Sequence, residues 1–157
     1  MADMIRISSN SAEIQGNLQS IRNQVSDLSP VMKGISLILL DATEQAFASE
    51  GPGWRPLSER TKRERAKKGK WPGKILQVTG QLAASVSTGT GHDELSAWVG
   101  TNKDYAYDNQ FGAPARKGHG IIPARPFLPM DEHGNLRTDT EEEIMDFLSR
   151  QLSKIIG

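Results

Sequence analysis

The chain has 157 residues, contains no cysteine, and balances 19 basic side chains with 19 acidic ones, which gives a formal net charge of zero. This length suits one domain with a buried core, and the zero net charge excludes a general electrostatic attraction to nucleic acid or membranes. The lack of cysteine excludes disulfides, thiolate metal sites and cysteine nucleophiles, and it fits a reducing compartment.

The sequence shows no targeting or membrane segment. Its N-terminus, MADMIRISSN, lacks the charged-then-apolar pattern of a secretory signal. The longest apolar run, residues 35–40, is interrupted by Ser36 and is far shorter than a bilayer span. We therefore expect a soluble protein that is made in the cytoplasm and has no membrane contact.

Residues 1–50 are predicted to be mainly helical, after a short strand at residues 4–7. Between residues 11 and 27, apolar side chains at spacings of four, three and four predict a half-exposed helix. Ser29 and Pro30 predict the N-cap and first position of a second helix that ends at Glu50. This helix is expected to be central to the core. Its predicted buried face consists of Val31, Ile35, Ile38, Leu39, Ala42, Ala46 and Phe47.

Residues 51–74 are predicted to form a basic excursion from the core. A loop leads to a short helix over residues 59–68, capped by Ser58. This helix has almost no apolar side chain, so it either stands on the surface or docks on a partner. Two interpretations are open: a nucleic-acid contact, or a mobile solvated loop. Its basic side chains are Arg60, Lys62, Arg63, Arg65, Lys67, Lys68, Lys70 and Lys74.

Two tryptophans flank this excursion. We predict that Trp54 and Trp71 are anchored in the core rather than used for binding. The stretch from Arg60 to Lys74 carries eight Lys/Arg against one Glu, whereas residues 131–146 carry seven acids against one Arg. Such a chain can associate head to tail with copies of itself, or it can present two solvated faces of a monomer.

Residues 75–130 are predicted to form the sheet. Residues 79–84 are read as a helical turn, and residues 85–88 and 95–100 as the two strands of an antiparallel hairpin. Residues 105–111 fit either a helix or a strand. Residues 121–128 are predicted as an extended strand at an edge, because prolines are confined to edge positions.

The stretch from Tyr105 to Leu128 is predicted to be a contact surface. It holds both tyrosines and two of the four phenylalanines, beside a loop that contains Arg116, Lys117 and His119. Two prolines stiffen the Arg-Pro-Phe sequence that follows this loop. For the two phenylalanines, core packing is the open alternative. The predicted interface consists of Tyr105, Gln110, Phe111, Arg125, Pro126 and Phe127.

The C-terminal segment is predicted as a helix over residues 138–156. Thr138 and Thr140 each precede a glutamate by three residues, so either can start a capping box. With helices at both ends and hairpin signals between them, we expect a single α+β domain over residues 1–157. In this fold, N-terminal helices and a C-terminal helix pack on a small antiparallel sheet.

No residue pattern predicts a catalytic, cofactor or metal site. His92, His119 and His133 lie beside glycine or aspartate in predicted loops, without the close pairing typical of zinc sites. The Thr-Gly-Thr-Gly sequence at residues 88–91 lacks the lysine of a phosphate-binding loop. We expect a protein that is not an enzyme and uses no cofactor.

Several short motifs occur in a fixed order between residues 54 and 128. This ordered set resembles the phage virion morphogenesis, or tail completion, family of Mu-like phages and prophages. The motifs are Gly53-Trp54, Pro56-Leu57-Ser58, Thr79-Gly80-Gln81-Leu82, Val99-Gly100, Gln110-Phe111-Gly112 and Ile122-Pro123-Ala124-Arg125-Pro126-Phe127-Leu128.

The resemblance implies a non-enzymatic virion protein that joins tails to heads or caps the tail. It implies stoichiometric action as a ring subunit, commonly in rings of six, at the tail end or head–tail connector of particles assembled in the host cytoplasm. The implied partners are other copies of the chain, the tail terminator or tube, and head–neck proteins. The alternative is a nucleic-acid-binding module that uses residues 60–74, including contact with packaged DNA.

Overall fold

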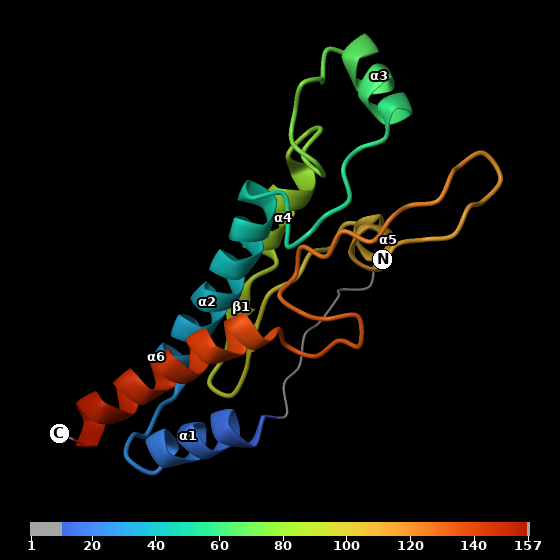
Figure 1. Ribbon diagram of the computed structural model, residues 1–157. Helices are drawn as coiled ribbons and strands as arrows, with labels where there is room; N and C mark the ends of the chain where they lie inside the picture. The colour runs from blue at the N-terminus through green and yellow to red at the C-terminus, as the bar shows by residue number, and fades with distance from the viewer. Residues whose placement is uncertain (1–10, 157) are drawn as a thin grey trace.

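The computed structural model describes residues 11–156 and consists mainly of helices (Figure 1). The predicted strand at residues 4–7 lies outside the described part. The expected α+β class is confirmed, because the described chain combines helices with a two-stranded antiparallel sheet. The elements are α1 (Ala12–Arg22), α2 (Ser29–Ala48), α3 (Glu59–Lys67), α4 (Gln81–Thr88), β1 (Gly91–His92), β2 (Ala97–Trp98), α5 (Ala106–Phe111) and α6 (Thr138–Ile156).

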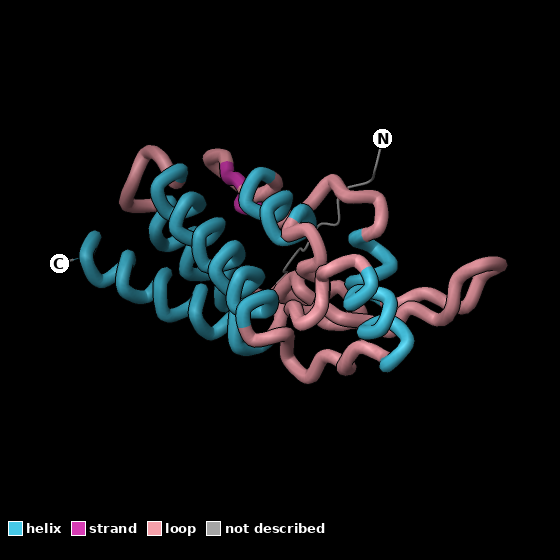
Figure 2. The backbone as a smooth tube through the Cα atoms, turned by 90° about the horizontal axis from the view of Figure 1, so that it is seen from above, coloured by secondary structure: helices cyan, strands magenta, loops and turns pink. Residues whose placement is uncertain are grey.

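The long helices α2 and α6 pack against each other, and α1 packs on α6, at one end of the molecule (Figures 1 and 2). The central position predicted for α2 is confirmed, because Val31, Leu39 and Phe47 are all buried. Gly34 allows α6 to approach closely, since a Cβ at this position would collide with the ring of Phe147. None of the described helices is long and apolar enough to cross a membrane.

The connection between α1 and α2 differs from the prediction. Helix α1 ends at Arg22 rather than at residue 27. The residues that follow Arg22 are mainly polar and have poor helix propensity. Ser29 is already helical and is not the N-cap. Instead, the carboxylate of Asp27 accepts a hydrogen bond from the Ser29 N–H at 2.9 Å, and this bond lowers the pKa of Asp27.

A tight turn after α2 places Trp54 in the core, as predicted. Gly51 has a φ of 85°, and a Cβ there would collide with the indole ring, so glycine is required. The indole Nε1 donates to the carbonyl of Pro126 at 2.8 Å. The ring meets Phe47 edge-on with 6.0 Å between centroids. This contact joins the end of α2 to a segment some 70 residues later in the chain.

The middle of the chain contains less sheet than predicted. Residues 81–88 form one helix, α4, in place of a turn followed by a strand, because Leu82 and Val86 bury one helical face. A hairpin follows, but its first strand is β1 rather than the predicted residues 85–88, and it pairs only Gly91 with Trp98 and His92 with Ala97. It packs against α2.

The predicted edge strand at residues 121–128 is wrong. Its pairing within the described structure is a single bridge between Ala113 and Ile122. After this bridge the chain turns inward, where the Arg125 N–H donates to the Asn109 carbonyl at 2.7 Å. The prolines of this segment cannot donate to a ladder, and its last residues are buried in the core instead.

Helix α6 covers the predicted range. Asp139, rather than the predicted capping box, holds its first turn, with its carboxylate accepting from the N–H of Thr140 at 2.9 Å. Ile144 and Leu148 bury the inner face, at the spacing of four expected for an amphipathic helix.

Candidate interaction surface

The basic helix α3 stands on the surface and is tied to the body by Arg65. It begins after Ser58, whose Oγ accepts from the N–H of Thr61 at 3.2 Å, as predicted. Arg65 is buried, and its Nη1 donates to the carbonyl of Lys74 at 3.0 Å. Burial lowers the pKa of Arg65, and the nearby charge of Glu50 acts in the opposite direction. Arg65 is therefore an anchor, unlike most cations of this segment.

The chain that returns from α3 closes the end of α2. Lys74 Nζ donates to the carbonyl of Ala48 at 2.9 Å, and Gln77 Nε2 donates to the carbonyl of Phe47 at 2.9 Å. The last carbonyls of a helix have no partner within the helix, so these bonds satisfy them. They also fix the base from which α3 projects.

The other cations of α3 and its return face outward. Arg60 pairs with Glu64 at 3.2 Å and Lys62 pairs with Glu59 at 2.9 Å, so these two cations offset acids of their own helix. Lys62 also lies 5.6 Å from the ring centroid of Trp71, which is exposed. The predicted anchoring of Trp71 in the core is therefore wrong. Four cations of this segment, Arg63, Lys67, Lys68 and Lys70, are exposed and have neither an ion pair nor a side-chain hydrogen bond in the described structure.

Residues 113–122 form a narrow two-limbed loop, here called the loop arm. Its limbs are joined by a bridge between Ala113 and Ile122 at the base and another between Arg116 and His119 near the tip. The arm leaves α5 through Gly112, which has a φ of 77°. A Cβ on this glycine would press into the backbone that follows the arm, so glycine is required.

The loop arm and α3 project from the same end of the molecule in both views (Figures 1 and 2). Lys117 and His119 are exposed at the tip of the arm. Arg116 Nη2 lies 3.6 Å from the carboxylate of Asp108 on α5. Two basic segments that are about 50 residues apart in the sequence thus project from one end of the molecule, which periodicity alone could not predict (Figure 1).

Helix α5 presents exposed aromatic side chains beside the base of the loop arm. Tyr105 is exposed, and Tyr107 has an exposed fraction of 62%. The rings of Tyr107 and half-buried Phe111 are 4.8 Å apart, as expected for residues separated by one helical turn. Ile121, in the arm, is 73% exposed. We call Tyr105, Tyr107, Phe111 and Ile121 the aromatic patch; of these, Tyr105 and Phe111 were predicted interface residues.

Gln110, a third predicted interface residue, faces inward from α5. Its Oε1 accepts hydrogen bonds from the N–H groups of both Phe127 and Leu128, each at 3.0 Å. Gln110 is buried, and so are the two residues that it binds. Its role is therefore to join α5 to the buried end of the Arg-Pro-Phe segment. The sequence gives one signal that Gln110 faces inward: it follows Ala106, the other buried residue of α5, by four positions.

Arg125 and Phe127 also lie inside the subunit, which corrects their prediction as an exposed interface. Arg125 is 8% exposed; its Nε donates to the carbonyl of Arg55 at 2.9 Å and its Nη2 to that of Pro56 at 3.2 Å. Burial first, and then neighbouring arginines, lower the pKa of Arg125. Phe127 is 0% exposed and packs 5.4 Å from Phe47. Internal contacts thus occupy both side chains, and the core alternative holds for Phe127.

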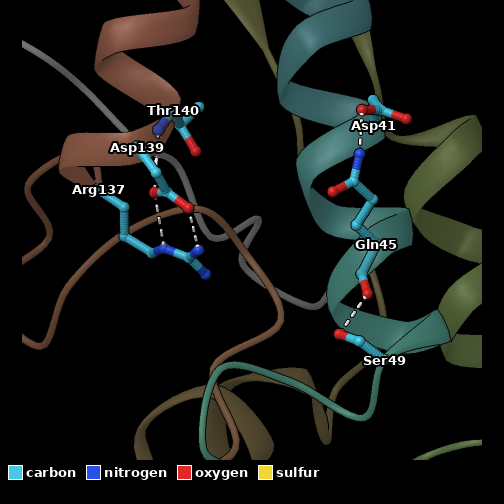
Figure 3. A network of polar contacts seen from close by, with 6 residues as sticks. All are labelled: Asp41, Gln45, Ser49, Arg137, Asp139 and Thr140. Atoms are coloured by element: carbon cyan, nitrogen blue, oxygen red, sulfur yellow. Dashed lines mark hydrogen bonds and ion pairs between the residues drawn. The ribbon is translucent and has the colours of Figure 1, made fainter.

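A small groove of about 190 Å³ lies between the end of α2 and the start of α6. On the α6 side, Arg137 holds Asp139 through two hydrogen bonds, of 3.2 and 2.6 Å, which lower the pKa of Asp139 (Figure 3). On the α2 side, Gln45 donates to Asp41 at 2.6 Å. These groups pair within their own segments, so the groove offers no evident arrangement for chemistry.

The described structure contains no group of three His, Asp or Glu side chains placed to hold a metal ion. The three histidines occupy different places: His92 in β1, His119 in the loop arm, and His133 in the exposed loop before α6. The features that stand out on the described surface are thus the two basic projections and the aromatic patch.

A model of the phage virion morphogenesis family matches residues 9–153. The chain is 36% identical over 125 residues to the putative capsid assembly protein G of Escherichia phage Mu, covering 73% of each chain. It is 35% identical over 150 residues to the Mu-like prophage FluMu G protein 2 of Haemophilus influenzae, covering 92% of this chain and 96% of that relative. No solved structure matches it.

Proposed function

The chain belongs to the phage virion morphogenesis family, and on this premise we propose that it completes the tail and joins it to the head as a stoichiometric, non-enzymatic ring subunit. The observation that carries the proposal is the family match over residues 9–153, which spans nearly the whole chain. The ordered motifs between residues 54 and 128 point to the tail side. The proposed location is the tail end or the head–tail connector.

The aromatic patch is the proposed contact surface between subunits. A ring requires two different patches on each subunit that fit one another. Aromatic side chains are enriched in the cores of protein interfaces, where lysine and glutamate are depleted. Tyr107, in α5, and Ile121, in the loop arm, are large hydrophobic side chains that are exposed, which suits them to such a core. The proposed ring contains six copies, and its proposed neighbours on the two faces are the tail terminator or tube and the head–neck proteins.

A second candidate is action on the capsid. It is favoured by the name of the phage Mu relative, which refers to capsid assembly. The two candidates differ in what an infected cell accumulates when the protein is missing. Loss of a capsid role leaves aberrant or empty heads, whereas loss of a joining role leaves full heads beside free tails.

Electron microscopy of lysates from a phage that lacks this protein tests the proposal. We expect full heads and separate, complete tails. Expression of the wild-type chain restores joined particles, and Tyr107→Ala with Ile121→Ser does not, although the purified double variant melts like the wild type. Leu37→Ala, at an exposed apolar position of α2, is the matched control and restores joining. Aberrant heads would instead assign the protein to the capsid.

A further inference from the structure

We propose that α3 and the loop arm together form a binding site for the phosphate backbone of double-stranded DNA. This inference uses other side chains than the proposed contact between subunits, and it does not rest on the joining role. It starts from the arrangement in Figures 1 and 2, in which both basic segments project from the same end of the molecule.

The charge at this end is concentrated and available. Arg63, Lys67, Lys68 and Lys70 are exposed, and none has an ion pair in the described structure. Lys117 adds an exposed cation at the tip of the loop arm. The acids of α3 are already paired with cations of the same helix. Phosphates approaching this surface therefore meet free cations and few free carboxylates.

The composition of α3 favours a phosphate backbone over a protein partner. Lysine is depleted in the cores of protein interfaces, which are built on apolar and aromatic anchors. The exposed side chains of α3 are almost all charged, and this helix offers no apolar stripe. Lysine and arginine side chains are the usual contacts to phosphates, and such contacts need no apolar core.

The two projections are also held in place. Arg65 and Lys74 fix α3 through hydrogen bonds to backbone carbonyls, and two bridges join the limbs of the loop arm. A surface that is already ordered loses less conformational freedom when it binds. Because these cations are proposed to contact phosphates and not the edges of the bases, we expect binding that is independent of DNA sequence.

The number of free cations sets the expected salt dependence. If Arg63, Lys67, Lys68, Lys70 and Lys117 each neutralise one phosphate, the slope of log K against log salt is about −4.5. Raising the salt from about 50 to about 200 mM then weakens binding roughly 500-fold. With only two of these contacts left, the slope is about −1.8 and the same change weakens binding roughly 12-fold.

Fluorescence anisotropy with a random-sequence DNA duplex tests the proposal on the full-length chain. The first variant carries Lys67→Glu, Lys68→Glu and Lys70→Glu. The matched control carries Lys33→Glu, Arg150→Glu and Lys154→Glu, which changes the net charge equally at exposed positions on α2 and α6. We expect the first variant to lose binding at least 100-fold and the control to stay within about threefold of the wild type. Lys117→Glu alone is expected to reduce the slope by about 1.

Three results would overturn the proposal. One is wild-type protein that does not bind the duplex at low salt, and another is equal loss of binding in the two triple variants. The third is that the Lys67→Glu, Lys68→Glu and Lys70→Glu variant binds DNA normally but no longer self-associates in analytical ultracentrifugation. That result would mean that α3 contacts the acidic face of a second copy. Each result leaves the joining role open, because joining is assayed separately on heads and tails.

Discussion

Removing the acceptor oxygen of Gln110 is expected to destabilise the protein strongly. Gln110→Met preserves the length of the side chain but leaves the buried N–H groups of Phe127 and Leu128 without their partner. An unsatisfied buried donor costs about 1–3 kcal/mol, so two donors cost about 2–6 kcal/mol. That loss is a large fraction of a typical unfolding free energy of about 5–15 kcal/mol.

Urea denaturation measures this loss as a change in the free energy of unfolding. For a chain of this size a loss of about 1 kcal/mol lowers the melting temperature by about 2–4 °C, so Gln110→Met should melt at least about 4 °C lower. Tyr107→Leu is the control on the same helix, because its side chain is exposed; it should change the free energy by less than about 0.5 kcal/mol. A Gln110→Met variant as stable as the wild type would refute the assignment of Gln110 as the link between α5 and the core.

Three further predictions address other parts of the fold. Gly34→Ala should lower the free energy of unfolding by about 1–3 kcal/mol, because the new Cβ collides with Phe147. Adding Phe147→Leu to this variant should recover part of the loss. If the double variant instead lost the sum of the two single losses, the close contact would be contradicted. Because Arg137 lowers the pKa of Asp139 in the folded protein, the ion pair stabilises the fold at pH values above the usual carboxyl pKa. This stabilisation is lost as the pH falls through the pKa that Asp139 has in the folded protein. Asp139→Asn should therefore reduce the difference in melting temperature between pH 7 and pH 3, and an unchanged difference would contradict this. Limited trypsin digestion should cut after exposed Lys68 before Lys74, whose ammonium is bonded to α2; the reverse order would be inconsistent with the structure.

The helices with long apolar periodicity could be predicted from the sequence. The apolar faces of α2 and α6 recur over about five turns each, so their positions follow from local pattern alone. Helix α4 could not be assigned in this way, because its second half, Ser-Val-Ser-Thr, is as typical of a strand as of a helix. Burial of Leu82 and Val86 against the rest of the fold decides the outcome.

The candidate site could be predicted only in part. The exposure of the α3 cations follows from the lack of an apolar face, which is visible in the sequence. The inward turn of Arg125 depends on carbonyls of residues 55 and 56, and no local pattern shows a partner that far away. The prolines of this segment predict an edge strand, whereas in the structure Arg125, Phe127 and Leu128 are buried in the core.

The most direct test of the proposed role is a titration of purified protein into an extract that contains full heads and free tails but lacks this chain. Joined particles are counted by infectivity against the molar ratio of protein to tails. A stoichiometric ring subunit predicts joining that rises with added protein and reaches a plateau at several copies per tail. Full joining by amounts far below one copy per tail would contradict that role, and so would an extract that fails because its heads are defective.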